Sequence, residues 1–271
     1  MSTNVVKALD SASGSQLTVK PITGVFGAEV SDIDLSRPID DLLHAQIERL
    51  IGEYKVVVFR DQHGVGPAEL ARFAANFGAV EKTPHPTLPN WPGVPEVKII
   101  QPQSTDVDVE DAWHTDGATR QSTRWLSFLQ AIDIPPYGRD TLYADMEAVY
   151  DDLSAAMQEF LEGLTVLHSW GYQDPDAPPV AHPMIKQNPV TGRKSVYVNR
   201  GYTRSIVGLK PVESEMLLEF LFRKAFLPLY QLRVAWTPGT ITVWDNQQTL
   251  HSIVRDSRYN RTMHRVMALA S

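Results

Sequence analysis

Apolar residues along this chain gather in short blocks, and glycine, proline and polar residues interrupt these blocks at close intervals. Short apolar or β-branched runs bounded by turn residues are typical of β-strands. Lys55–Arg60 has a continuous apolar centre, which indicates a buried strand, and Trp125–Ile132 is also predicted to be a core strand. The same criteria predict strands at Leu17–Ile22, Gly27–Val30, Val97–Ile100, Asp140–Ala144, Ser195–Asn199, Gln231–Trp236, Ile241–Trp244 and Arg261–Ala270.

Other segments have the spacing of an amphipathic helix, with apolar residues three and four positions apart. Pro38–Glu53 is the clearest case, because Leu43, Ile47 and Leu50 fall on one face. Acidic residues stand near its start, as the helix dipole favours. Further helices are expected from about Pro67 to Phe77, as two short helices within Met146–Leu164, and over Val212–Phe226.

Two proline-rich stretches, Thr83–Pro95 and Gln173–Pro189, are expected to be loops. Long loops are often functional, so Gln173–Pro189 is either a lid over a site or an extended surface connection. Residues 1–15 are polar and rich in serine, threonine and alanine. They lack the apolar core of a secretory signal, and we expect them to form a disordered leader.

Many short strands with few helices favour a mainly β fold with flanking helices over a parallel α/β sheet. A sandwich of jelly-roll type fits this order of elements. A length of 271 residues suits one large domain, because β-rich domains of this size often stay undivided. We therefore expect a single domain over residues 16–271, after the leader.

The composition narrows the possible partners and chemistry. A net charge of −7 and the lack of a lysine or arginine run argue against binding to nucleic acid. No apolar run has the length of a membrane span, so no membrane partner is expected and a cytoplasmic location is the default. The chain has no cysteine, which excludes disulfides, iron–sulfur clusters and cysteine nucleophiles. Any metal must therefore be held by imidazole and oxygen ligands.

One short motif offers such ligands. His114 and Asp116 are two positions apart, so on an extended strand both side chains point to one side while Thr115 points away. Two imidazoles and one carboxylate on one face of an iron form the facial triad of non-haem Fe(II) oxygenases, and His251 is available as the second imidazole. The His-x-Asp triplet alone is not specific, because it also occurs by chance on strands that face solvent.

A longer series of motifs gives this triplet its context: Val56–Gln62, Phe77-Gly78, Trp113–Asp116, Gly138-x-Asp140-Thr141, Tyr197–Asn199, Val243–Asn246 with His251, and Arg261-x-Met263-His264-Arg265. In order and spacing these motifs resemble the taurine dioxygenase (TauD/TfdA) family of Fe(II)/2-oxoglutarate-dependent oxygenases. That family also includes 2,4-dichlorophenoxyacetate dioxygenases and alkylsulfatases. The resemblance covers nearly the whole chain, from about Leu17 to Leu269.

The resemblance implies a double-stranded β-helix (jelly roll) and the activity of an Fe(II)/2-oxoglutarate-dependent dioxygenase. In the family pattern, His114, Asp116 and His251 bind Fe(II), while Arg261 and Thr141 hold the distal carboxylate of 2-oxoglutarate. O2 is the other cosubstrate, and succinate and CO2 are the coproducts. A guanidinium fork pairs with a carboxylate through two parallel hydrogen bonds, which suits Arg261 to this role. If the triad residues were absent, a surface ion pair would be the simpler interpretation of Arg261.

The resemblance also implies a prime substrate that is a small anionic molecule, a sulfonate or a carboxylate. Arg265 corresponds to the arginine that contacts the substrate anion, and on a strand it can share a face with Arg261. An ion pair with an acidic side chain is the alternative for Arg265. His85 corresponds to a substrate-contacting histidine in a proline-rich loop. Glu110 and Tyr202 stand where taurine enzymes have asparagine and phenylalanine, so taurine itself is not implied.

Other functions stay open on the sequence alone. Within the family, the alternatives are an alkylsulfatase, an ether-cleaving aryloxyalkanoate dioxygenase and a hydroxylase of an amino-acid derivative. Outside it, the triad would hold zinc in a non-oxidative jelly roll, or Arg261 and Arg265 would capture a small anion in a binding module. Family members are commonly dimers or tetramers, so the resemblance also implies a homo-oligomer.

Overall fold

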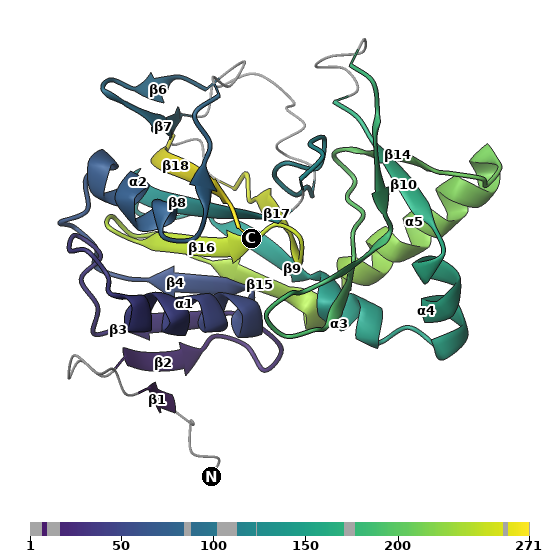
Figure 1. Ribbon diagram of the computed structural model, residues 1–271, viewed down its shortest axis with the longest axis horizontal. Coiled ribbons are helices and arrows are strands. Elements are labelled where there is room, and N and C mark those ends of the chain that lie inside the picture. The colour runs from purple at the N-terminus through teal and green to yellow at the C-terminus, as the bar shows by residue number, and fades with distance from the viewer. Residues whose placement is uncertain are drawn as a thin grey trace.

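A long β-sheet forms the body of the molecule in the computed structural model (Figure 1), which describes residues 7–9, 17–83, 88–101, 113–122, 124–170, 177–256 and 260–270. Within these residues ten strands form the sheet, and its pairs are antiparallel except β3 with β4. The order is β1 (Lys7–Leu9), β2 (Leu17–Pro21), β3 (Ala28–Ser31), β4 (Val56–Phe59), β16 (Ile241–Asp245), β8 (Trp125–Asp133), β18 (Thr262–Leu269), β7 (Val94–Ile100) and β6 (Asn90–Trp91), with β5 (Ala79–Val80) paired to β18. Segments from both ends of the chain therefore meet at the centre of the sheet.

A smaller antiparallel sheet packs against the long one. Its order is β15 (Gln231–Val234), β9 (Thr141–Asp145) and β17 (Thr249–Ile253). Buried side chains of both sheets pack together between them, among them Val58 and Trp244 from the long sheet and Tyr143 and Leu232 from the smaller one. This arrangement of mainly antiparallel sheets with flanking helices confirms the expected jelly roll.

Two helices cover the opposite face of the long sheet (Figure 1). They are α1 (Asp41–Tyr54) and α2 (Pro67–Ala75). Because successive side chains of a strand alternate between faces, β4 places Val57 and Phe59 under these helices and Val56 and Val58 between the sheets. The unbroken apolar sequence of β4 follows from this burial on both faces.

The helix ends follow local signals in the sequence. Asp40 caps α1, and its carboxylate accepts a hydrogen bond of 2.8 Å from the N–H of Leu43. Lys55 ends that helix in the left-handed conformation, with φ of 65°. Pro67 and Pro211 stand in the first turn of their helices, where a backbone N–H has no partner within the helix.

A second group of elements packs beside β9 and β17 around an apolar core of its own. Its members are α3 (Met146–Asp151), α4 (Ala155–Glu162), α5 (Pro211–Ala225), β10 (Thr165–His168), β11 (Val180–Pro183), β12 (Ile185–Gln187), β13 (Lys194–Val196) and β14 (Thr203–Ile206). Leu161, Val166 and Leu221 are buried in this core. α3 begins directly where β9 ends, which connects the second group to the smaller sheet.

The structure corrects the predicted loops. Gln173–Pro189 contains strands β11 and β12, and Thr83–Pro95 contains β6 and the start of β7. The described prolines of both stretches lie at strand ends or beside them, where a missing N–H is tolerated, so the proline content was misleading. Within the expected leader, residues 7–9 form β1 and pair with β2.

The remaining predictions of secondary structure agree with the described residues apart from shifted ends, and α3 and α4 are the two short helices expected within Met146–Leu164.

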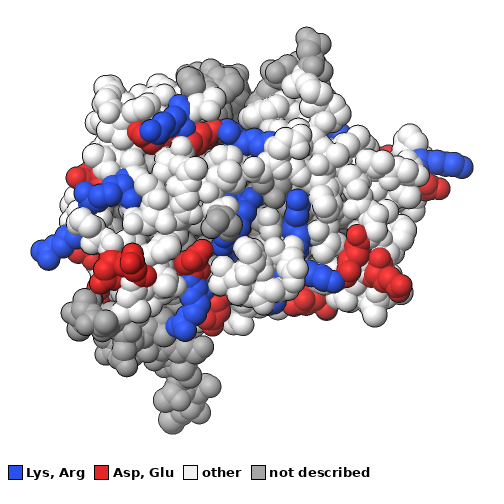
Figure 2. All heavy atoms as spheres, viewed as in Figure 1, with Lys and Arg blue, Asp and Glu red and all other residues white. Residues whose placement is uncertain are grey.

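No helix in the described part of the chain has the length and apolar character needed to cross a membrane. Basic and acidic side chains are interspersed over the face shown in Figure 2. On that face an anion would therefore be recognised by individual basic residues rather than by an extended basic surface.

Lys55, between α1 and β4, has its ammonium group buried against two carboxylates. Its Nζ lies 3.0 Å from Asp145 Oδ2 and 3.0 Å from Glu147 Oε2, and all three side chains are fully buried. Asn188 Nδ2 also donates to Glu147, at 2.8 Å. Asp145 and Glu147 lie where β9 turns into α3, so this ion cluster ties the long sheet to the second group of elements.

Lys55→Met should lower the free energy of unfolding by about 3–5 kcal/mol, because it leaves two buried carboxylates with only the partly exposed Arg193 as a cation. Lys82→Met is the matched control. Lys82 is 71% exposed in its pair with Glu96, and surface pairs of this kind contribute at most about 1 kcal/mol. Denaturant unfolding of both variants measures the difference, and similar small losses would contradict a structural role for the buried cluster.

Candidate metal and cosubstrate site

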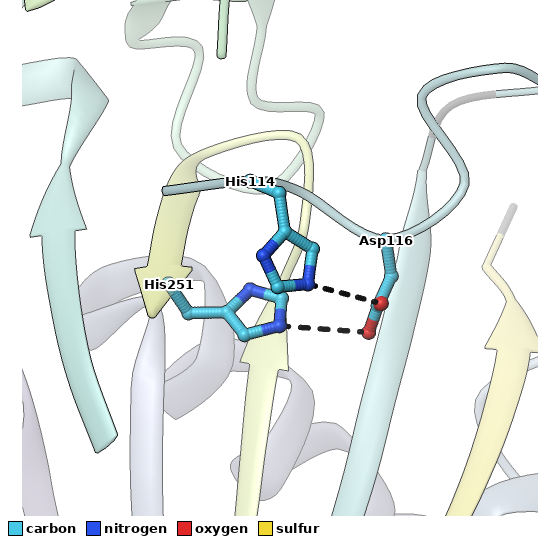
Figure 3. A group of neighbouring side chains, drawn as sticks. All are labelled: His114, Asp116 and His251. Atoms are coloured by element: carbon cyan, nitrogen blue, oxygen red, sulfur yellow. Dashed lines mark ion pairs between the residues drawn. The ribbon is translucent and has the colours of Figure 1, made fainter. Parts of the chain in front are cut away.

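Three potential metal ligands meet where the two sheets pack together (Figure 3). His251 lies on β17, and His114 and Asp116 lie in the segment that leads into β8. Their ligand atoms all lie within 4.8 Å of one another, and the three side chains are buried. His114 Nε2 is 3.9 Å from Asp116 Oδ1, and His251 Nε2 is 3.9 Å from Asp116 Oδ2. Across the described residues, no other such group of histidine, aspartate and glutamate occurs.

Backbone pairing brings the two histidines together. The N–H of His114 donates to the carbonyl of His251 at 3.0 Å, and the reverse bond measures 2.8 Å. The ring centroids are 4.1 Å apart. The expected extended strand is present only as this isolated bridge, which a turn follows directly. Thr115 points away from the triad, as the spacing predicts, and its hydroxyl donates to the carbonyl of Asn246.

Asp116 receives hydrogen bonds on both carboxylate oxygens. Ser127 Oγ donates to Oδ2 at 2.7 Å, and Arg265 Nη1 donates to Oδ1 at 3.1 Å. Asn246 supports this arrangement, because its Oδ1 accepts from the N–H of Asp116 at 3.0 Å and its Nδ2 donates to Ser127 Oγ at 2.8 Å. Contacts of this kind fix the orientation of a ligand before a metal arrives.

The protonation states of Asp116 and His251 suit metal binding. Burial alone would raise the pKa of Asp116, but Arg265 and the two histidines outweigh burial and hold that pKa well below its usual value. Burial, helped by the neighbouring His114, lowers the pKa of His251 to about 3. At neutral pH the site thus offers an ionised carboxylate and a neutral His251 imidazole, the forms that bind a divalent metal. This donor set of imidazole and carboxylate without sulfur fits Fe(II).

Arg261 and Thr141 lie on the side of the triad formed by the smaller sheet. Arg261 is 2% exposed, acts electrostatically on His251, and donates from Nη1 to the carbonyl of Arg139. Thr141 begins β9, and its Oγ1 accepts a hydrogen bond of 3.0 Å from Trp236 Nε1. The guanidinium carbon of Arg261 is 5.7 Å from the centroid of the same indole. Trp236 therefore contacts both residues that the resemblance assigns to 2-oxoglutarate.

A small pocket of about 40 Å³ opens beside His114 and Asp116. Arg265 and Arg120 line it together with the carboxylate of Glu81, which pairs with Arg120. Lys98 lies directly opposite Arg265 in the pairing of β7 with β18. Two carboxylates already offset part of this charge, because Asp116 accepts from Arg265 and Glu81 acts on Lys98. The pocket itself has two guanidinium groups in its wall, which suit the anionic group of a small ligand.

Two of the four residues expected to contact the prime substrate, Arg265 and Tyr202, line this pocket. The other two, His85 and Glu110, lie outside the described residues. Sequence analysis did not single out Glu81 or Arg120, which the structure adds to the pocket wall. The position of Arg120, four residues after Asp116 in the same segment, was the available signal.

Comparison with known proteins places this site in a family context. A family model described as the taurine catabolism dioxygenase TauD, TfdA family matches residues 18–267. The chain is 31% identical over 261 residues to an alkylsulfatase of Acinetobacter baylyi, covering 89% of this chain and 81% of that protein. It is 33% identical over 273 residues to an alpha-ketoglutarate-dependent sulfonate dioxygenase of Saccharomyces cerevisiae, covering 92% and 65%. The crystal structure of a taurine dioxygenase from Burkholderia xenovorans matches with a TM-score of 0.84 and 32% identity, covering 94% and 90%.

Asp116→Ala should abolish tight binding of Mn(II), used as a stand-in for Fe(II), because it removes the charged ligand of the triad. Ser127→Ala keeps the ligand and loses its orienting hydrogen bond, so the metal Kd should rise about 10-fold or more. Asp151→Ala, at an exposed carboxylate, is the control. Titration followed by electron paramagnetic resonance measures all three, and native affinity in Asp116→Ala would refute this assignment.

Proposed function

Because the chain belongs to the TauD, TfdA family, we propose that it hydroxylates a small organic anion bound in the pocket beside the triad. This membership confirms the resemblance that the sequence analysis stated, and the protein is an Fe(II)/2-oxoglutarate-dependent dioxygenase. It therefore uses Fe(II), 2-oxoglutarate and O2. The pocket lined by Arg265 carries the proposal, because it joins an anion-binding guanidinium to the candidate metal site.

His114, Asp116 and His251 are the proposed Fe(II) ligands, supported by their mutual distances and burial and by the lowered pKa values of Asp116 and His251. Arg261 and Thr141 are the proposed anchors of the distal carboxylate of 2-oxoglutarate. When bound, Fe(II) and 2-oxoglutarate with O2 supply the oxidising power, and succinate and CO2 are released. The contribution of the chain is to bind, to orient and to limit access of water.

The side chains of the pocket divide these tasks. Arg265 presents its guanidinium to the substrate anion while it donates to Asp116. Tyr202 and Trp170 form an aromatic wall, with their ring centroids 5.4 Å apart, and Tyr202 lies edge-on to His114 at 6.1 Å. An aromatic wall next to the ligands excludes water from the carbon that is to be hydroxylated.

A sulfonate or a carboxylate is the proposed substrate class. A second guanidinium in the pocket wall, that of Arg120, supports an anionic substrate. The carboxylate of Glu81, which pairs with Arg120, reduces the positive charge of the wall. An alkyl sulfate, an aryloxyalkanoate cleaved at its ether and an amino-acid derivative are the alternatives. The relatives named above are a sulfonate dioxygenase, a taurine dioxygenase and an alkylsulfatase, which favours a substrate with a sulfonate or sulfate group among these candidates.

A homo-oligomer, a dimer or a tetramer, is proposed as the working form of a single domain over residues 16–271. Val212, Met216 and Phe220 of α5 form a row that is 66%, 70% and 45% exposed. The opposite face of α5 packs into the core, and a helix that is apolar on both faces is normally covered on both. A groove of about 1020 Å³ runs beside this row, away from the triad.

A second copy of α5 in antiparallel orientation fits this surface. The first turn of the helix contains Glu213 and the last contains Arg223. Antiparallel pairing centred between Met216 and Phe220 brings the acidic turn of each copy near the basic turn of the other, as a two-fold contact requires. The two apolar rows would then cover each other.

One of the candidate anions should stimulate the release of succinate from 2-oxoglutarate. Before that screen, anaerobic addition of Fe(II) to the protein should give an absorption band that depends on 2-oxoglutarate. A zinc protein would lack this band, and an anion-binding module would bind its ligand regardless of chelators.

Arg265→Met should raise KM for the active anion by about 10-fold or more, because a hydrogen bond to a charged group contributes roughly 1.5–3 kcal/mol. Arg233→Met, at an exposed arginine, is the control, and an unchanged KM in Arg265→Met would contradict the proposed role.

Met216→Glu should convert the oligomer to a smaller species, because it places a charge at the centre of the apolar row. Phe160→Glu is the matched control on α4, where Phe160 is 48% exposed and lies outside this row. Sedimentation velocity measures the species present. A monomeric unaltered protein, or an oligomer that resists Met216→Glu but not Phe160→Glu, would rule out the α5 surface.

A further inference from the structure

Trp236 lies at the end of the smaller sheet, two positions beyond β15, and is buried. Its indole Nε1 donates a hydrogen bond of 3.0 Å to Thr141 Oγ1, and both groups are buried. The two residues are 95 positions apart in the chain. The pairing of β15 with β9, in which Val234 lies opposite Thr141, brings them together.

The polarity of this hydrogen bond has a chemical consequence. An indole N–H can only donate, so the oxygen of Thr141 must accept. The single hydroxyl proton of Thr141 is then directed away from the indole and can be donated to another acceptor. A carboxylate is such an acceptor, because it has no proton of its own when ionised.

We propose that Trp236 is a positioning residue for 2-oxoglutarate, which fixes the hydroxyl of Thr141 as a donor toward the distal carboxylate. This inference rests on the proposed function, in which Thr141 and Arg261 hold that carboxylate. A threonine hydroxyl without this partner rotates among several orientations. The indole thus removes a rotational choice before the cosubstrate binds, which is how a site gains affinity by preorganisation.

The same indole lies beside the other proposed anchor. The guanidinium carbon of Arg261 is 5.7 Å from the ring centroid of Trp236, within the range of a cation–π contact. The carbonyl of Arg139 accepts from Arg261 on another side. Arg139 has φ of 61° and follows Gly138 with φ of 77°, and this left-handed turn holds its carbonyl near the arginine. One aromatic residue and one turn therefore define where both anchors stand.

A purely structural role is the competing explanation, because a buried tryptophan needs a partner for its N–H in any case. Trp236→Phe separates the two. Phenylalanine keeps an aromatic ring beside Arg261 and in the apolar core, and it removes only the N–H donor. A structural role predicts lower thermal stability with normal cosubstrate affinity. A positioning role predicts weaker binding of 2-oxoglutarate at unchanged metal affinity.

The test is an anaerobic titration of 2-oxoglutarate into the Fe(II)-loaded protein, with the absorption band of the complex as readout. Trp236→Phe should raise the Kd of 2-oxoglutarate about 5- to 10-fold, the scale of one hydrogen bond. The Mn(II) affinity of the same variant should match that of the unaltered protein. Trp91→Phe is the matched control, because Trp91 lies on β6 and packs against His264.

Two further arms test the route through Thr141. Thr141→Val should weaken binding by itself, and adding Trp236→Phe to Thr141→Val should change the Kd less than about 2-fold, because the hydroxyl to be oriented is gone. With 2-oxopentanoate, which has the same keto acid head and no distal carboxylate, Trp236→Phe should bind as the unaltered protein does. Full additivity, or an equal loss with 2-oxopentanoate, would overturn the assignment.

The outcomes for this inference and for the proposed function are distinct. If the unaltered protein gives no band that depends on 2-oxoglutarate, the proposed function fails and this inference fails with it. If the unaltered protein gives the band and Trp236→Phe binds 2-oxoglutarate equally well, only the positioning role is refuted. Trp236→Tyr also lacks the indole N–H, and it replaces the phenylalanine variant in every arm if that variant does not fold.

Discussion

The buried charge of Asp116 is the constraint on which the rest of the site depends. A carboxylate that is 7% exposed is costly unless cations and hydrogen-bond donors compensate for the water it has lost. The compensation comes from separate strands, because Ser127 of β8 and Arg265 of β18 each donate a hydrogen bond to the carboxylate. Each of these strands must be correctly paired before the carboxylate can remain ionised. The metal site is thus a product of the whole sandwich rather than of one motif.

Strand register turns this local requirement into a property of the fold. In the pairing of β8 with β18, Leu129 lies opposite Arg265 and Ser127 opposite Met267, so Ser127 and Arg265 are diagonal neighbours on one face. A shift of one residue in either strand would turn that strand's side chain away from Asp116. The same alternation directs His264 to the other face, where its ring lies 4.8 Å from that of Trp91.

The parts of the site that depend on local alternation could be predicted from the sequence. The convergence of His114 and Asp116 needs only their spacing, and the inward direction of Arg265 needs only a strand. The contact of Trp236 with Thr141 could not be predicted, because it exists only through the pairing of β15 with β9. Strands β11 and β12 were missed for a similar reason: they exist through pairing with other strands, while the stretch that contains them is rich in proline. His85 and Glu110 remain predictions, since their segments lie outside the described residues.

The two inward arginines differ in a way that fits two different ligands. Arg261 is almost fully enclosed, and the carbonyl of Arg139 and the indole of Trp236 restrict its guanidinium. A cation fixed in this way suits a cosubstrate whose distal carboxylate is always the same. Arg265 instead lines an open pocket and shares its guanidinium with Asp116. Because a guanidinium has five N–H donors, it can keep the bond to Asp116 while it receives a substrate anion. The group that recognises the anion is then in direct contact with the metal ligand. Substitutions farther out in the pocket wall, for example at Glu81 or Arg120, can alter which anion is accepted while the oxidising centre keeps its geometry.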